Sequence, residues 1–438
     1  MILKGDKKII RAWTFYDWAN SVYPLVITTA IFPIFYETVT GAGPLGIGTG
    51  PNNDLITFFG SEIKNSVLYS FVVAASLLVV CILSPLLSGI ADFAGSKKRF
   101  LQFFCLLGSV ACATLYFFDA HHLELSMLSV FFASIGFYNS LVFYNAYLPD
   151  IAEPADHDRI SARGFSMGYF GSAILLIACL VLIRIFGMSP ENCFWITGVW
   201  WLGFAQITFW KLPSPSQKAK ITGKILGNGF RELLKVGHFV RKTSRLKRFL
   251  VSFFLFSMGV QTLMLMAVLF AKKEVFKDGD TSGLIIAVLL IQFIAIPGAL
   301  AFSRASSKFG NLTTLRIALV IWVFCCTFAY FFVYDTFNFY ILASIVGFVM
   351  GGTQSLSRST YSKFLPETED TASFFSFYDI TEKMGMVFGM VIFGYVEASS
   401  GDMRMSVLAL ITFFVLGFIA LLFVPKSEKN SFEEAQQH

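Results

Sequence analysis

The apolar segment Phe374–Val396 contains three charged residues, which lie within about one helical turn of one another. Asp379, Glu382 and Lys383 occupy positions i, i+3 and i+4, so Asp379 can reach either neighbour on one helical face. Lys383 lies roughly 13 Å into the segment, and an isolated charge in mid-membrane would cost on the order of 3 kcal/mol. Pairing with one acid lowers that cost and leaves the other acid free to exchange a proton. We expect a proton-coupling or substrate-charge site; the alternative is an ion pair that only fixes helix packing.

A polar stripe lies in the first apolar segment of the chain. Asp17, Asn20, Ser21, Pro24 and Thr28 fall at i, i+3, i+4, i+7 and i+11, which is one face of a helix. Polar groups inside a bilayer are costly and face a cavity or another helix. The stripe therefore predicts the wall of a water-accessible cavity. The alternative is an interfacial Asp17, since it lies only about 6 Å into the segment.

Neutral polar residues occupy the middle of three further apolar segments. Asn139, Gln261 and Gln292 could hold the ends of a zwitterion, or could join helices by hydrogen bonds worth about 0.6 kcal/mol each. Gln354 and Arg358 share one face near the end of another segment. We expect these two to be gate residues, with the alternative that Arg358 is a charged anchor at the membrane surface.

The composition identifies the elements that must position these residues. Only 14% of the 438 residues are charged and 55% are hydrophobic, whereas a soluble domain carries about 25% charged residues. A soluble fold of this composition would expose large apolar areas, and disorder requires low hydrophobicity. The chain is therefore expected to be an all-α integral membrane protein.

Histidine and cysteine give no sign of a cofactor or a metal. The five histidines fall in polar connections or in the C-terminal tail, which argues against an intramembrane haem or metal centre. The seven cysteines lack the spacing of a disulfide framework or a zinc site. We expect them to be small hydrophobic fillers.

Apolar runs of about 18 or more residues are candidate membrane helices. Twelve such runs occur, at Trp13–Val39, Lys64–Ala91, Phe100–Phe118, Leu125–Leu148, Gly164–Phe186, Phe194–Trp210, Phe249–Ala271, Ser282–Phe302, Leu312–Val333, Phe337–Leu356, Phe374–Val396 and Ser406–Val424. The first run is too long for a signal peptide and lacks its cleavage site, so it is expected to be retained.

The connections fix the expected orientation. With the N-terminus inside, 26 of the 34 Lys and Arg residues fall in inner segments and five in outer connections. Because cytoplasmic loops carry the excess of positive charge, both termini are expected in the cytoplasm. No organellar targeting sequence is evident, which fits a bacterial inner membrane.

A basic stretch divides the chain. Residues 211–248 carry eleven Lys and Arg against a single acid, Glu232. We expect a cytoplasmic linker that touches anionic headgroups, with Gly229–Val240 as a surface amphipathic helix; nucleic-acid or calmodulin-like binding is the alternative. The linker separates an N-terminal six-helix half, 1–210, from a C-terminal half, 249–425, and residues 426–438 form a cytoplasmic tail.

The two halves resemble each other weakly. Aligning Gly95, after the second run, with Gly310, after the eighth, gives an offset of 215 residues. Leu148-Pro149-Asp150 and Leu365-Pro366-Glu367 give an offset of 217. The agreement of two unrelated landmarks favours duplicated six-helix halves.

The turn after the second run resembles the signature of the major facilitator superfamily. The stretch Ser88–Lys97 matches Gly-x-x-x-Asp-Arg-x-Gly-Arg-Lys at Asp92, Gly95 and Lys97, while Ser307 replaces the Asp in the second half. The resemblance implies twelve helices in two pseudo-symmetric bundles, with Asp92 near a helix N-terminus of the other half. Any tight turn could use the same residues. We add Asp150 and Arg163 to this expected hinge and gate.

A narrower resemblance covers most of the chain. Phe15–Ser21 looks like the vacuolar amino-acid-effluxer-like branch and its bacterial relatives, the "unknown major facilitator" family. Phe143–Ala152, Gly351–Ser359 and Phe374–Lys383 support it. The family pattern has Asn and Gly where this chain has Asp379 and Glu382. The resemblance implies a transporter, with amino acids among its candidate cargo.

The function expected is secondary active transport of a small polar solute by alternating access, coupled to protons, by a monomer in the bilayer. A membrane enzyme of lipid or head-group metabolism is one alternative, but no phosphate loop, HExxH motif or nucleophile elbow is present. Asp156-His157-Asp158 has no nucleophile beside it. A non-transporting membrane scaffold is the other alternative. Neither a cofactor nor a nucleic-acid partner is expected.

Overall fold

The computed structural model describes residues 4–41, 46–49, 54–213, 225–276 and 281–425. Regular structure in these ranges is helical apart from one hairpin, in which β1 (Leu55–Phe58) pairs antiparallel with β2 (Ser61–Lys64) and places Leu55 opposite Lys64. The sequence was expected to be all-α, and this hairpin lies in the connection between the first and second membrane segments.

The first half contains six long helical segments and four short helices. The long segments are α1 (Lys7–Asn20) continued by η1 (Tyr23–Ala30) and α2 (Phe32–Thr40), then α3 (Asn65–Ala94), α4 (Lys97–Thr114), α5 (Leu123–Asn145), α7 (His157–Arg184) and α8 (Asn192–Lys211). The short helices are η2 (Leu115–Phe117), η3 (Ala120–His122), α6 (Leu148–Ile151) and η4 (Pro154–Asp156).

The second half repeats the arrangement after a linker helix. The linker helix is α9 (Ile225–Lys242), and the six long helices are α10 (Ser244–Glu274), α11 (Thr281–Phe309), α12 (Asn311–Phe332), α13 (Thr336–Phe364), α14 (Thr371–Ser400) and α15 (Met403–Leu422). The prediction of twelve membrane helices in two bundles is confirmed. Ten of the twelve are long and apolar enough to cross a membrane, and the other two, α8 and α14, are more polar.

The first segment changes its helical winding at proline. Pro24 lies in the first turn of η1, a π-helix, and Pro33 in the first turn of α2. A proline has no N–H to donate and its ring clashes with the preceding turn, so it interrupts a regular α-helix. Thr28 and Thr29 both donate hydroxyl hydrogen bonds to the Pro24 carbonyl. These bonds join Thr28, the last residue of the polar stripe, to Pro24 within the π-helix.

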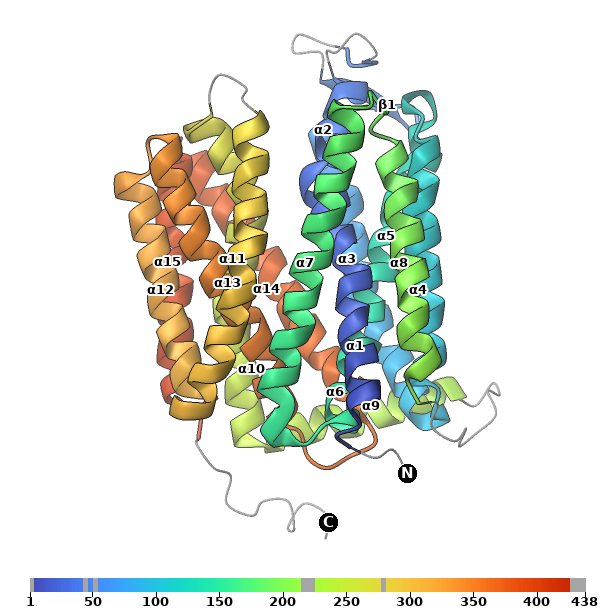
Figure 1. Cartoon of the computed structure of the whole chain (residues 1–438), viewed down its shortest axis with the longest axis vertical. Coiled ribbons are helices and arrows are strands. Elements are labelled where there is room, and N and C mark those ends of the chain that lie inside the picture. The colour runs from blue at the N-terminus through green and yellow to red at the C-terminus, as the bar shows by residue number, and fades with distance from the viewer. Residues whose placement is uncertain (1–3, 42–45, 50–53, 214–224, 277–280, 426–438) are drawn as a thin grey trace.

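The two bundles meet along two pairs of helices. α7 of the first half packs against α11 and α13, and α14 of the second half packs against α3 and α5. Figure 1 shows α9 at one end of the molecule and the β-hairpin at the other, with the bundles separating toward the hairpin. We call these the α9 end and the hairpin end.

Helix α9 lies against both halves at the α9 end. It begins earlier than the predicted surface helix, and it is amphipathic: Val236 and Val240 are buried, whereas the charged Arg231 and Arg241 are exposed. It packs on α3 and α14, where the Phe239 and Phe374 rings lie 5.6 Å apart. Residues 214–224 of the linker and 426–438 of the tail lie outside the described residues. The proposed division into two halves, linker and tail stays a prediction.

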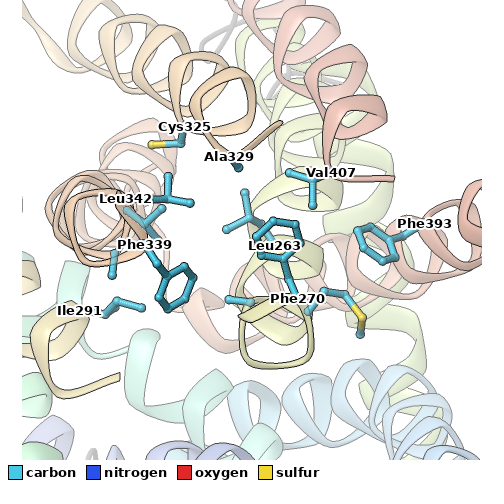
Figure 2. Close-up of a pocket in the computed structure, with 13 residues that line it drawn as sticks. Leu263, Phe270, Ile291, Cys325, Ala329, Phe339, Leu342, Phe393 and Val407 are labelled. Carbon is cyan, nitrogen blue, oxygen red and sulfur yellow. The ribbon is translucent and has the colours of Figure 1, made fainter. Parts of the chain in front are cut away.

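The interiors of the two bundles differ near the hairpin end. In the first half a group of aromatic rings fills the space, with centroids 5.3–6.3 Å apart; it includes Phe32, Phe35, Phe118 and Phe194. In the second half an apolar void of about 40 Å³ lies between α10, α11, α12, α13, α14 and α15. Figure 2 shows Leu263, Phe270, Phe339 and Phe393 around it.

Candidate functional site

A cavity of about 310 Å³ lies between the two halves. This volume is at the lower end of the range for small-molecule sites. Its walls come from α1, η1, α5 and α7 of the first half and from α10, α11, α13 and α14 of the second. All five residues of the polar stripe line it, and the other predicted residues on its wall are Gln261, Gln292, Gln354, Arg358, Glu382 and Lys383.

Two predicted cavity residues do not line it. Asp379 is buried directly behind Lys383. Asn139 is fully buried in α5, where its amide donates to the Ile135 carbonyl one turn earlier. The structure therefore separates Asn139 from the expected solute site and leaves it as a group inside the first bundle.

The first charged group on the wall belongs to α14. Lys383 Nζ donates to Asp379 Oδ1 at 2.6 Å and to Glu382 Oε2 at 2.9 Å. Gln261 Nε2, on α10, donates to Glu382 Oε1 at 2.8 Å. Lys383 Nζ also lies 4.7 Å from the centroid of the Tyr138 ring on α5, so one side chain of the second half contacts the first half by a cation–π interaction. We call Asp379, Glu382, Lys383 and Gln261 the α14 cluster.

The second charged group crosses between the halves. Arg358 Nη2, on α13, lies 3.2 Å from Asp17 Oδ2 on α1, and the Tyr144 hydroxyl donates to the same oxygen at 2.7 Å. Arg358 also donates from Nε to Ser161 Oγ at 2.9 Å and from Nη1 to Asn145 Oδ1 at 3.2 Å. Three elements of the first half thus bind one guanidinium of the second, and this planar group satisfies several acceptors at once.

Aromatic rings enclose the same guanidinium. Its carbon lies 4.1 Å from the centroid of Phe165 and 4.9 Å from that of Trp13. Arg358 is only 2% exposed. The alternative interpretation of Arg358 as a membrane-surface anchor is therefore wrong, because its charge is neutralised by Asp17 inside the protein rather than by water or headgroups.

Glycine at position 164 leaves room for this pair. A Cβ atom there would overlap Asp17 Oδ2 and would lie 2.9 Å from Arg358 Nη2. Any larger residue on α7 would have to displace one member of a buried ion pair. This is a close approach that requires glycine.

The bonds of Arg358 form a first layer of contacts between the halves. A second layer of such bonds surrounds Asp92, at the α9 end. Asp92 accepts hydrogen bonds from the backbone N–H groups of Ala372 and Ser373 at 3.2 and 2.7 Å, in the first turn of α14. A carboxylate at a helix N-terminus satisfies unpaired N–H groups and complements the helix dipole. This is the neighbour that the resemblance implies for Asp92. Gly95 ends α3 in the left-handed conformation, with φ of 62°, which favours glycine.

Lys97 extends this layer. Its Nζ donates to Asp150 Oδ2 at 2.7 Å and to the Thr371 hydroxyl at 2.6 Å. Two residues of the first half, Lys97 and Asp150, therefore lie together against the start of α14. The basic residues missing from the signature are not needed for this contact.

A third layer depends on Asp158, which was not among the predicted site residues. It accepts hydrogen bonds from Ser306 at 2.6 Å, Asn311 at 2.7 Å and Lys363 Nζ at 2.6 Å, all from the second half. The sequence placed Asp158 in a loop, because the apolar run begins at Gly164, whereas α7 begins at His157. The absent acid at Ser307 was the available signal: Asp158 of the first half supplies the carboxylate at that turn.

The remaining gate residues have different surroundings. Gln354 accepts a hydrogen bond from the Tyr169 hydroxyl at 2.6 Å, across the halves. Arg163 is exposed, and the part of the chain that the structure describes offers it no hydrogen bond or ion pair. The structure thus places Asp92, Gly95, Lys97 and Asp150 together at the start of α14. Gln354 lies on the cavity wall, and Arg163 lies outside these contacts.

The hairpin end has far fewer bonds between the halves. There the described residues form one ion pair between bundles, Lys272 Nζ to Glu37 Oε2 at 3.3 Å, and both side chains are more than half exposed. Within the described ranges, no group of three His, Cys, Asp or Glu side chains is arranged to hold a metal ion. The arrangement is a polar cavity, closed by buried bonds at the α9 end, which can admit a small solute.

The sequence of the chain is similar to those of known membrane transporters. Residues 5–434 match the family model described as "Vacuole effluxer Atg22 like". The chain is 31% identical to the uncharacterized MFS-type transporter YxiO of Bacillus subtilis, over 100% of this chain and 99% of that one. It is 23% identical to autophagy-related protein 22 of Coccidioides immitis, over 95% and 85% of the two chains.

Solved structures share the fold at low sequence identity. The human organic anion transporter MFSD10 superposes with a TM-score of 0.72 at 11% identity, over 95% of this chain and 99% of that one. The major facilitator transporter FucP in the outward conformation gives 0.68 at 13% identity, over 97% and 99%. The relatives are transporters and not enzymes of lipid metabolism. The chain belongs to the vacuole effluxer Atg22-like family and is a transporter of the major facilitator superfamily.

Proposed function

We propose that this transporter moves amino acids, or closely similar small polar solutes, by alternating access coupled to protons. The observation that carries the proposal is the polar cavity between the halves, with both charged groups on its wall. A site enclosed between two bundles can be exposed to one side and then the other when the bundles rock about it. The three layers of cross-half bonds at the α9 end are the contacts that must break in that motion.

The neutral groups on the wall support a polar solute. Asn20 Nδ2 and Gln292 Oε1 are buried on opposite halves and have no hydrogen-bond partner among the described residues. A buried donor and acceptor of this kind are costly unless a ligand or water pairs with them. A solute with a donor and an acceptor group could satisfy both and so draw the halves together.

Proton coupling is proposed for the α14 cluster. Lys383 is held by two carboxylates, and Glu382 is the one that lies on the cavity wall. A membrane-buried acid at a solute pathway is a site where proton transfer and solute binding can be linked.

The placement in the membrane is also proposed. The excess of Lys and Arg in the inner connections supports a bacterial inner membrane with both termini, and therefore the α9 end, in the cytoplasm. The cavity is then closed toward the cytoplasm in this conformation. We propose that the monomer is the transporting unit, since each chain contains both halves of the cavity.

The test is flux into proteoliposomes that contain the purified full-length chain. A panel of amino acids is offered with and without an imposed pH gradient, and Arg358→Gln is compared with Arg159→Gln, whose ion pair with Asp156 is exposed. We expect gradient-dependent flux in the wild type and in Arg159→Gln but not in Arg358→Gln. Absence of flux for every solute, in protein that is folded and correctly inserted, would overturn the proposal.

A further inference from the structure

The charges around the cavity do not balance. Among the described residues, four charged side chains line the cavity: Asp17, Arg358, Glu382 and Lys383. A fifth, Asp379, lies behind the wall and is bonded to Lys383. Asp17 and Arg358 neutralise each other. Lys383 carries one positive charge against two carboxylates, which leaves an excess of one negative charge.

Glu382 is the carboxylate that presents this excess to the cavity. The Asp379 side chain is 5% exposed and contacts Lys383 at 2.6 Å, whereas the Glu382 side chain is 24% exposed and lies on the wall. Each Glu382 oxygen accepts one hydrogen bond, from Gln261 or from Lys383. A carboxylate oxygen can accept more than one, so both keep acceptor capacity for a further donor.

Aromatic rings lie beside this carboxylate. Tyr138 and Tyr378 both line the cavity, and Tyr378 stacks on Phe253 with ring centroids 4.3 Å apart. Of the aromatic residues on the wall, Tyr138 and Tyr378 are the ones close to Glu382, whereas Phe165 lies against the Arg358 guanidinium. A carboxylate among aromatic faces is a combination that recognises organic cations, because the ring faces attract positive charge and exclude water.

An unmatched carboxylate inside a membrane is costly unless a proton or a cation neutralises it. We infer that Glu382 binds the cationic group of the substrate and a proton in alternation, so that the two compete for one carboxylate. The inference rests on the proposed transport function and adds a substrate class to it: amino compounds with a net positive charge. Competition for one site also makes the process an exchange of one substrate charge for one proton.

Other titratable groups face this carboxylate and will contribute to any pH dependence. Asp379, Lys383 and Tyr378 lie on its own helix, Tyr138 faces it from α5, and Cys81 on α3 lies close to Asp379 and Lys383. Gln261, on α10, is neutral. The variants must therefore distinguish the loss of Glu382 from a general effect of pH.

L-arginine and L-citrulline are suitable probes, because they have almost the same shape and differ by one positive charge. A cavity of about 310 Å³ is within the range of small-molecule sites and gives room for a molecule of this size. Binding of each is measured to the purified full-length protein in detergent, and exchange is measured in proteoliposomes.

The expected result is charge-selective binding that weakens in acid. Arginine should bind at least about tenfold more tightly than citrulline near pH 8, and its affinity should be lower near pH 4.5, where protons begin to compete for a carboxylate. Glu382→Gln should lower arginine affinity toward that of citrulline and remove the acid effect. Glu382→Asp should keep the acid effect with weaker binding.

The matched control is Glu397→Gln. It is the same substitution on the same helix, at a residue that pairs with Lys273 outside the cavity wall, and it should leave arginine affinity and its pH dependence unchanged.

Equal binding of arginine and citrulline at both pH values, or binding of neither, would overturn the inference. So would an unchanged acid effect in Glu382→Gln. These outcomes leave the proposed transport intact if amino acid flux is observed. Selective binding without flux would instead overturn the transport function.

Discussion

The two ends of the interface between the halves are held in different ways. At the α9 end, the Asp92, Asp158 and Arg358 side chains are buried and each accepts or donates two or more hydrogen bonds across the halves. At the hairpin end, the ion pair between Lys272 and Glu37 is exposed. Buried, multiply bonded charges are costly to separate, whereas an exposed pair contributes little. We therefore expect the contacts at the α9 end, rather than those at the hairpin end, to hold the two halves in this conformation.

Removal of Arg358 should have the largest effect on this asymmetry. Arg358→Ala leaves Asp17 buried with Tyr144 as its one remaining side-chain donor among the described residues, and breaking a buried pair costs about 3–5 kcal/mol. We expect flux to be lost and the α9 end to open. Opening is measured by labelling Ser357→Cys on the cavity wall with an impermeant thiol reagent applied from the α9 side.

The labelling uses a Cys81→Ser background, because the other six native cysteines are buried. Arg159→Ala is the control, since it removes an exposed arginine near the same end. If Ser357→Cys reacts equally in both variants, Arg358 does not hold this end closed.

Substitution of Asp158 should have the second largest effect on the closure of the α9 end. Asp158→Asn keeps the size of the side chain but removes the charge that three donors share, at a cost of about 3 kcal/mol for a buried charged group. The same labelling should increase, and flux should fall less than in Arg358→Ala. The exposed neighbour Asp156→Asn is the control, because it bonds only Arg159 among the described residues. Equal labelling of the two variants would remove Asp158 from the closure.

A methyl group at position 164 should have an intermediate effect. Gly164→Ala places Cβ against Asp17 and Arg358, and overpacking of this kind costs about 1–3 kcal/mol. The control is Gly203→Ala on α8, where an added Cβ meets no atom within 4 Å. We expect thermal stability and flux to fall in Gly164→Ala only. Full flux in that variant would show that the pair can shift without loss.

The smallest effect is expected at the hairpin end. Lys272→Gln removes an exposed ion pair, which is worth about 0–1 kcal/mol. Flux and Ser357→Cys labelling should both stay within error of the wild type, and Glu37→Gln should behave in the same way. An effect as large as that of Arg358→Ala would reverse the comparison, since it would place the controlling contact at the other end.

The sequence was sufficient for what depends on local periodicity. Hydrophobic runs predicted the helices. Helical spacing predicted that Asp17, Asn20 and Ser21 share one face, and that Asp379 lies within reach of Lys383 four residues later. These are contacts along one helix, whose geometry is fixed by 3.6 residues per turn.

Contacts between segments far apart in the chain could not be predicted from the sequence. Arg358 meets Asp17 across 341 residues of sequence, and Asp158 is bound by groups from α11, α12 and α13. These depend on how two bundles dock, which no local pattern encodes. The start of α7 was missed for a related reason: its polar first turns are stabilised by the opposite half and not by the bilayer.

The apolar void in the second bundle makes that half the more compressible one. Pressure favours states that eliminate internal empty volume, and the first bundle has aromatic rings at the corresponding level. Hydrostatic pressure should therefore collapse the space between Leu263, Phe270 and Phe339 (Figure 2) before it disturbs the first half. A small noble gas such as xenon should bind in the same void, since apolar cavities of this kind stay dry. If the two halves move against each other as proposed, the first would therefore be the stiffer body and the second the more compressible one.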